Sequence, residues 1–232
     1  MKQQDSAPHI LYEDNHLLFA EKEAGLLTQP ADGGKSLEDI LKAFLKEKYQ
    51  KRGNVFLHAV HRLDRPTSGI VLFAKSQKAL ARLNAMQREG LIRKEYLAIC
   101  EGHIASGVLK HTLMHYSHHA QVVPEGTPGG KSATLSYEVL EVGKPGTLIL
   151  VTLKTGRYHQ IRAQMAASGH PILGDTKYGG APFFPHSVIA LHHFRMTVPH
   201  PITQKALTIT SRPPIFWPMT IKDGFATMRD YS

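Results

Sequence analysis

The chain has 232 residues, of which 42% are hydrophobic and 20% are charged. These values are ordinary for a globular protein and argue against disorder along the whole chain. The 28 lysines and arginines outnumber the 19 aspartates and glutamates, so the formal net charge is +9. Such a surplus favours a polyanionic partner, because clustered cations bind phosphates and release counterions. The same surplus would also be explained by solubility alone.

The single cysteine, Cys100, excludes an internal disulfide and a thiolate-rich zinc site. The apolar residues that precede it predict a buried thiol. The polar start of the chain lacks the apolar segment of a secretory signal, and no apolar run reaches the roughly 18 residues that span a bilayer. We therefore expect a cytoplasmic protein without a membrane partner.

Hydrophobic periodicity predicts an α+β fold with more strand than helix. The elements expected in the first half are two short strands within 9–20, a helix capped by Ser36, a buried strand at 70–73, a helix from Ser76 to Gly90 and a strand at 93–101. The second half is expected to hold an irregular excursion at 102–131, strands at about 133–142 and 147–154, a helix from Tyr158 to Ser168, and strands near 188–197 and 205–210.

A carboxylate lies in a constrained loop before the buried strand at 70–73. Asp64 stands between Arg62 and Arg65, and Pro66 and Gly69 restrict or permit special backbone angles. Loops anchored on a rigid strand often hold catalytic groups. A carboxylate between two arginines is also typical of a surface ion-pair cluster. The residues by themselves leave both interpretations open.

The expected helix from Tyr158 carries a second polar pattern. His159 and Arg162 are three residues apart and share a helix face. Arg162 could hold a carboxylate by a bidentate pair, which would orient that carboxylate and keep it ionised. An exposed helix with ordinary surface charge also fits this spacing.

The chain contains 15 histidines, which raises the question of a metal site. His58 and His61, and the histidines within 115–119, have spacings that suit two ligands, but no third ligand motif accompanies them. We expect no metal, and interpret these imidazoles as facing solvent or RNA.

Four longer segments resemble a known family. They are HRLDRPTSG at 61–69 with the following IVLFAKS, KEYLAICEG at 94–102, TGRYHQIRAQMAASGHPILGDTKYG at 155–179, and ALHHFRMTVPHP at 190–201. In this order they resemble the signature of the RluA-type pseudouridine synthases, and the resemblance spans residues 9 to 212. It implies the pseudouridine synthase fold, a mixed, largely antiparallel sheet with flanking helices and a central catalytic cleft, and no metal or organic cofactor. The expected organisation is a flexible tail at 1–8 and a single catalytic domain at 9–232.

The resemblance also implies roles for individual residues. Asp64 is similar to the essential aspartate, and Arg62 to the arginine that takes the place of the flipped nucleotide. Tyr96 is similar to the tyrosine that lies against the target uracil, and Arg162 to the basic residue that pairs with the aspartate. Asp64, Tyr96 and Arg162 are therefore the expected catalytic residues. The residues expected to contact RNA or assist base flipping are Arg62, Arg65, Lys94, Arg157 and His159.

The activity implied by the resemblance is the isomerisation of a specific uridine in structured RNA, either transfer RNA or large-subunit ribosomal RNA, by a monomer. An RNA-binding module on the same fold without catalysis is the alternative. A hydrolase with Asp64 as nucleophile is more distant, because it would need a second acid nearby.

The sequence departs from the family pattern in three ways. No S4-like RNA-binding module is expected, because the matching segments begin near residue 9. Lys22-Glu-Ala-Gly25 stands where relatives usually have Lys-Pro before the glycine, and His193 stands where the family usually has alanine. We expect these departures to bear on substrate choice.

Overall fold

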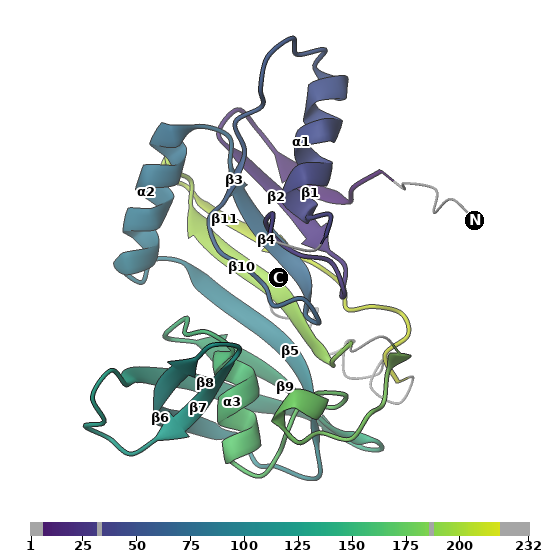
Figure 1. Cartoon of the computed structure of the whole chain (residues 1–232), viewed down its shortest axis with the longest axis vertical. Coiled ribbons are helices and arrows are strands. Elements are labelled where there is room, and N and C mark those ends of the chain that lie inside the picture. Colours follow the sequence, from purple (N-terminus) through teal and green to yellow (C-terminus); the bar gives the residue numbers. More distant parts are fainter. Residues whose placement is uncertain (1–6, 32–33, 186–187, 219–232) are drawn as a thin grey trace. The chain divides into compact units, whose positions relative to one another are not determined.

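The computed structural model describes residues 7–31, 34–185 and 188–218, so most of the tail expected at 1–8 lies outside the described residues. The chain divides into two compact units. Unit 1 comprises Met1–Ile92 and Arg195–Ser211, and unit 2 comprises Arg93–Phe194 and Arg212–Ser232. The colours of Figure 1 follow the chain from unit 1 into unit 2 and back. Each unit is built around β-strands, in agreement with the expected α+β class.

The sheet of unit 1 is built on a fully buried central strand. Its strand order is β1 (Ile10–Glu13), β2 (Leu17–Lys22), β4 (Ser68–Ala74) and β10 (Leu191–Pro199), with β3 (His58–Ala59) on β4 and β11 (Ala206–Thr210) on β10. The pairs β1–β2, β2–β4, β3–β4 and β10–β11 are antiparallel. Every residue of β4 is buried, which confirms the strand predicted at 70–73. Strand β10 enters unit 1 at Arg195.

Two capped helices belong to unit 1. Helix α1 (Leu37–Lys48) begins at Ser36, whose hydroxyl accepts the Asp39 N–H while the Asp39 carboxylate reaches the Ser36 backbone. Helix α2 (Gln77–Arg88) begins after Ser76, whose hydroxyl accepts the Ala79 N–H, and the positive φ of Gly90 follows its end. Both starts were predicted. An apolar cluster of this unit contains residues of β2, β4, α2 and β10. Each buried aliphatic side chain contributes about 1.5–3 kcal/mol.

Unit 2 is built on an antiparallel sheet with a helix packed on it. The strand order is β5 (Arg93–Glu101), β9 (Gly146–Leu153), β8 (Lys131–Val142), β6 (Gly107–Tyr116) and β7 (His119–Val123). Helix α3 (Gln160–Ala167) contacts β6, β7 and the short 3-10 helix η1 (Thr176–Tyr178). Figure 1 shows α3 next to β7. The strands expected near 93–101, 133–142 and 147–154 are confirmed as β5, β8 and β9.

The prediction of an irregular excursion at 102–131 is wrong. Strands β6 and β7 form an antiparallel hairpin there, and β6 also pairs with β8. Much of β6 is exposed or half-buried, so polar and histidine side chains occupy many of its positions and conceal the two-residue alternation of a strand. Long-range packing decides the structure instead, because Leu113 and Ala120 pack with Ala133 and Ala163 of neighbouring elements.

Candidate active site

Asp64 lies in unit 1, in the loop that joins β3 to β4. Its side chain is half-buried, and its carbonyl oxygen accepts the Thr67 N–H at 3.0 Å, which closes a tight turn through Pro66. The neighbouring Leu63 is held by Thr28, whose hydroxyl donates to the Leu63 carbonyl at 3.0 Å and accepts the Leu63 N–H at 3.1 Å. The loop is therefore fixed on both sides of the carboxylate.

Lys22 anchors the same loop from β2. Its side chain is fully buried, and its Nζ donates to the carbonyl oxygens of Glu23, Leu26 and Arg65 at 2.9, 2.7 and 3.2 Å. Burial lowers the pKa of Lys22 to about 7, while the charge of Asp64 opposes this fall. Three carbonyl acceptors match the three donors of an ammonium group. The contacts therefore suit the charged form of a lysine that interacts electrostatically with Asp64.

The two arginines beside Asp64 are exposed. Arg65 is tied to the preceding loop, because its Nε donates to the Gly25 carbonyl at 2.9 Å and its own carbonyl accepts the Gly25 N–H at 2.7 Å. Gly25 has a φ of 91°, a left-handed angle that glycine adopts without a steric penalty. Arg62 keeps an exposed side chain at the surface of unit 1.

Arg162 lies in unit 2 and is buried, with a side-chain exposure of 5% against 1% for its partner Asp175. The guanidinium binds that carboxylate through two bonds, from Nε to Oδ2 at 2.7 Å and from Nη2 to Oδ1 at 2.8 Å. Arg162 also lies over the ring of Tyr178, 5.0 Å from its centroid. Arg162 thus holds a carboxylate by a bidentate pair, with Asp175 as the partner, and the exposed-helix alternative is excluded. Its expected pairing with Asp64 stays a prediction.

His159 extends this group, and its hydrogen bonds determine its tautomer. Its Nε2 lies 3.2 Å from Arg162 Nη1, which can only donate, so Nε2 must accept. The proton then resides on Nδ1, which lies 2.7 Å from the Tyr178 hydroxyl oxygen, and that oxygen also accepts the Ala120 N–H at 2.8 Å. Burial, with Arg162 and Lys177 adding to it, lowers the pKa of His159 to about 3. The imidazole is therefore neutral. Hydrogen bonds connect Arg162, Asp175, His159 and Tyr178 into one group.

The start of α3 differs from the predicted start at Tyr158. His159 has a left-handed φ of 51° and makes no side-chain cap, so the helix begins at Gln160. The Gln160 amide oxygen holds the turn that precedes the helix, because it accepts the Arg157 N–H at 2.9 Å and the Thr155 hydroxyl at 2.8 Å. The Arg157 side chain is exposed and donates from Nε to the Ser132 carbonyl.

Tyr96 and Lys94 lie two residues apart on β5, so their side chains project from the same face of the strand. Tyr96 is 7% exposed, and its ring stacks on His193 with a centroid separation of 4.4 Å and an interplanar angle of 13°. Lys94 is half-buried, and burial lowers its pKa to about 8. The structure therefore gathers the predicted residues of unit 2 on β5 and at the start of α3.

Three findings bear on other kinds of site. Within the described ranges, no group of three or more His, Cys, Asp or Glu residues is placed to hold a metal ion. Cys100 is buried as predicted, and burial raises the pKa of its thiol to about 12. No helix in the described part of the chain is long and apolar enough to cross a membrane.

Sequence reasoning missed three residues of these groups. Asp175 and Tyr178 lie inside the segment at 155–179 that carries the family resemblance, so their position in a long shared motif was the available signal. Lys22 was visible as a cation at the end of the apolar run Leu17-Leu-Phe-Ala20, where a buried charge requires partners.

Comparison with known proteins gives a consistent result. Residues 16–167 match the family model described as RNA pseudouridylate synthase. The chain is 34% identical to the uncharacterized RNA pseudouridine synthase YhcT of Bacillus subtilis over 85% of the chain and 66% of that protein. It is 33% identical to the ribosomal large subunit pseudouridine synthase C of Vibrio cholerae over 86% of the chain and 64% of that protein. The chain thus spans just under two thirds of the length of these two relatives.

Two further similarities cover nearly the whole of the matched protein. The chain is 34% identical to the dual-specificity RNA pseudouridine synthase RluA of Haemophilus influenzae over 88% of the chain and 92% of that protein. Among solved structures, human RNA pseudouridylate synthase domain containing 4 superposes with a TM-score of 0.77 at 21% identity, covering 92% of each chain. This last similarity concerns the fold alone.

Proposed function

We propose, from the premise that the chain belongs to the RNA pseudouridylate synthase family, that it isomerises uridine in RNA to pseudouridine. The observation that carries the proposal is the family match over residues 16–167, which contains Asp64, Tyr96 and Arg162. The basic composition supports a polyanionic substrate. The single catalytic domain expected at 9–232 is part of this proposal.

The reaction is an isomerisation and needs neither a redox partner nor a group carrier. The bond between ribose carbon 1′ and uracil nitrogen 1 breaks, and carbon 1′ bonds to carbon 5 of the same base. Carbon 5 loses its proton and nitrogen 1 gains one, so atoms and charge balance. The protein must therefore supply a charged group beside the ribose, a surface that retains the detached base, and a way to move one proton.

We assign the charged group to Asp64. An ionised carboxylate can add to the ribose or the ring, or can remove a ribose proton, and each route requires the same charged side chain. The constrained loop suits this role, because a positioned group loses little entropy in the transition state. The buried Lys22, which anchors this loop, interacts electrostatically with this carboxylate.

Tyr96 and Arg162 complete the proposed catalytic set. Tyr96 presents an aromatic ring for the uracil and a hydroxyl for the proton at carbon 5. Arg162 is the basic residue that the family resemblance pairs with the aspartate. Its bonds to Asp175 and His159 use three of the five guanidinium N–H donors, and they fix its plane. Arg62, Arg65, Lys94, Arg157 and His159 are the proposed RNA-contacting and base-flipping residues, and they offset a flipping cost of roughly a few kcal/mol.

Release of tritium from carbon 5 of uridine-labelled RNA tests the activity, because the new bond displaces the hydrogen at that carbon. We expect the wild-type protein to release tritium, and Asp64→Asn and Asp64→Ala to release none while they keep the wild-type fold and RNA affinity. Glu47→Gln, at an exposed carboxylate of α1, is the matched control and should be fully active. Normal turnover by purified Asp64→Ala would refute the assignment, and tight binding without wild-type turnover would favour an RNA-binding module.

We further propose structured RNA, transfer RNA or large-subunit ribosomal RNA, as the substrate, acted on in the cytoplasm by a monomer. The names of the relatives support this choice, since one is a ribosomal large subunit enzyme and another is described as dual-specificity. Chemical mapping of pseudouridines across total RNA, with and without the gene, identifies the uridine. Sites lost only from ribosomal RNA or only from transfer RNA decide between the two classes.

A further inference from the structure

The C-terminal end of α1 carries a basic and aromatic surface that the proposed chemistry does not use. Residues 42–52 contain five lysines and arginines and one carboxylate, Glu47. Tyr49 is 47% exposed. The exposed cations of this segment are Lys46, Lys48, Lys51 and Arg52. We call Tyr49 with Lys48, Lys51 and Lys75 the Tyr49 platform.

The backbone of Tyr49 is held by the way α1 ends. Its N–H donates to the Leu45 carbonyl at 3.1 Å, and the chain then turns through Gln50, which has a left-handed φ of 49°. The N–H groups of Gln50 and Lys51 donate to the Glu47 and Lys46 carbonyls, both at 3.0 Å. This pattern is the Schellman motif, usually completed by glycine. A glutamine at this position costs some backbone strain.

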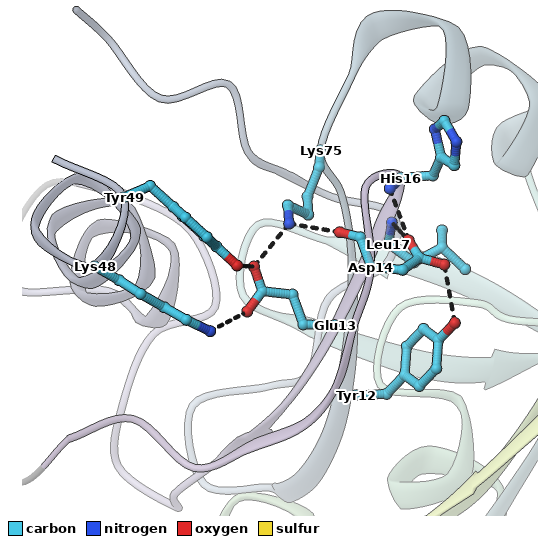
Figure 2. A network of polar contacts seen from close by, with 8 residues as sticks. All are labelled: Tyr12, Glu13, Asp14, His16, Leu17, Lys48, Tyr49 and Lys75. Atoms are coloured by element: carbon cyan, nitrogen blue, oxygen red, sulfur yellow. Dashed lines mark hydrogen bonds and ion pairs between the residues drawn. The ribbon is translucent and has the colours of Figure 1, made fainter. Parts of the chain in front are cut away.

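The ring of Tyr49 is fixed at its other end by Glu13 of β1. Figure 2 shows the Tyr49 hydroxyl and the Lys75 ammonium directed at one carboxylate oxygen, at 2.9 and 2.7 Å, and Lys48 at the other, at 2.8 Å. Burial opposes ionisation of Glu13, but the hydrogen bonds from Lys48, Lys75 and Tyr49 outweigh it and lower its pKa to about 2. The carboxylate therefore stays charged near neutral pH, and the ring is anchored at its hydroxyl.

Three lysine ammonium groups lie near this anchored ring. The ammonium groups of Lys48, Lys75 and Lys51 lie 5.2, 5.5 and 5.9 Å from the Tyr49 ring centroid. Ion pairs with Glu13 hold Lys48 and Lys75. Lys51 is exposed and lies beyond the helix end, so its flexible side chain can turn toward a phosphate without breaking either ion pair.

We infer that the Tyr49 platform binds an unpaired base of the RNA substrate by stacking on Tyr49, with Lys51 contacting a neighbouring phosphate. The inference rests on the proposed function for the identity of the ligand. A rigid aromatic ring with cations close to it suits single-stranded RNA, because a base can stack on the ring while the cations neutralise the phosphates. An anionic lipid surface or an acidic peptide would use the cations but would gain nothing from a ring whose hydroxyl is already bound.

Three variants at Tyr49 and one at Lys51 test the inference, with a transcript that the wild-type protein modifies. We expect Tyr49→Ala to raise both KM and the Kd for RNA about 10-fold, with kcat unchanged. Tyr49→Phe and Tyr49→Trp keep a ring and should stay within about 3-fold of wild type by the same stacking argument. Lys51→Ala should reduce the slope of log Kd against log salt by about 0.7 to 0.9, and Lys205→Ala, at an exposed lysine of the same unit, should leave it unchanged.

The outcomes separate this inference from the proposed function. Wild-type affinity in Tyr49→Ala, or an equal loss in Tyr49→Ala and Tyr49→Phe, would overturn the stacking role. An equal loss of binding to heparin or to phosphatidylserine vesicles in Tyr49→Ala would also overturn it, because these polyanions carry no bases. If wild-type protein releases no tritium, the proposed function fails, and the Kd values for a single-stranded oligoribonucleotide still decide the role of Tyr49.

Discussion

The buried pair of Arg162 and Asp175 offers the sharpest test of the structure of unit 2. Replacing Asp175 by asparagine keeps the shape of the side chain but removes its charge and places an amide NH₂ against guanidinium donors. The two charge-assisted bonds measure 2.7 and 2.8 Å, and the substitution removes one of them. Arg162, whose side chain is 5% exposed, then no longer has the negative charge of Asp175 beside it. Breaking such a pair costs about 3 to 5 kcal/mol, and we expect the lower end because the asparagine oxygen can still accept.

Urea and thermal unfolding measure this cost. A loss of about 3 kcal/mol in a chain of this length corresponds to a decrease of roughly 6–12 °C in the unfolding midpoint. The pair can also be removed as a whole with Arg162→Met and Asp175→Leu. Each single variant leaves one buried charge, whereas the double variant leaves two apolar side chains. We therefore expect the double variant to recover most of the stability, with a coupling free energy above about 2 kcal/mol.

Turnover distinguishes positioning from stability in the same set of proteins. If Arg162 acts in the reaction as proposed, the double variant folds but releases no tritium, and Asp175→Asn loses kcat more than RNA affinity. A loss of stability below about 1 kcal/mol in Asp175→Asn would refute the reasoning from burial. So would a double variant whose destabilisation equals the sum of the single ones.

Three further predictions concern unit 1. Burial lowers the pKa of Lys22 from its ordinary 10.5 to about 7 in the folded state. Wild-type stability should therefore rise with pH between these values, by up to about 1.4 kcal/mol per pH unit, and Lys22→Met should flatten this slope in urea titrations. Glu13 has a folded pKa of about 2 against 4.5, so its contribution is present above pH 4.5 and disappears toward pH 2; Glu13→Gln should show a smaller loss of unfolding midpoint between pH 6 and 3 than wild type. Ser36→Ala should cost about 1 kcal/mol by loss of the cap, and an unchanged urea midpoint would contradict it.

The elements that the sequence predicts correctly depend on local signals. The start of α1 follows from Ser36 and Asp39, because a capping box involves residues only three apart. Strand β4 follows from an uninterrupted apolar run, and the strand at 93–101 has the predicted bounds. In these cases the residues that decide the structure are neighbours in the chain.

The features that escaped prediction depend on contacts between distant residues. The β6–β7 hairpin is recognisable only through its pairing with β8 and its packing on α3. Lys22 contacts the carbonyl of Arg65, a separation of 43 residues. Arg162 finds its carboxylate 13 residues away. The periodicity of a single helix or strand does not reveal such long-range contacts. The sequence therefore shows where a charged residue lies, but not which group it contacts.

His193 shows what a departure from the family pattern means in three dimensions. This histidine, where the family usually has alanine, is fully buried and covers one face of the Tyr96 ring at a centroid distance of 4.4 Å. An alanine methyl group cannot cover a phenol ring, so here an imidazole plane restrains the ring through parallel stacking. The substitution therefore bears on how firmly the Tyr96 ring is held.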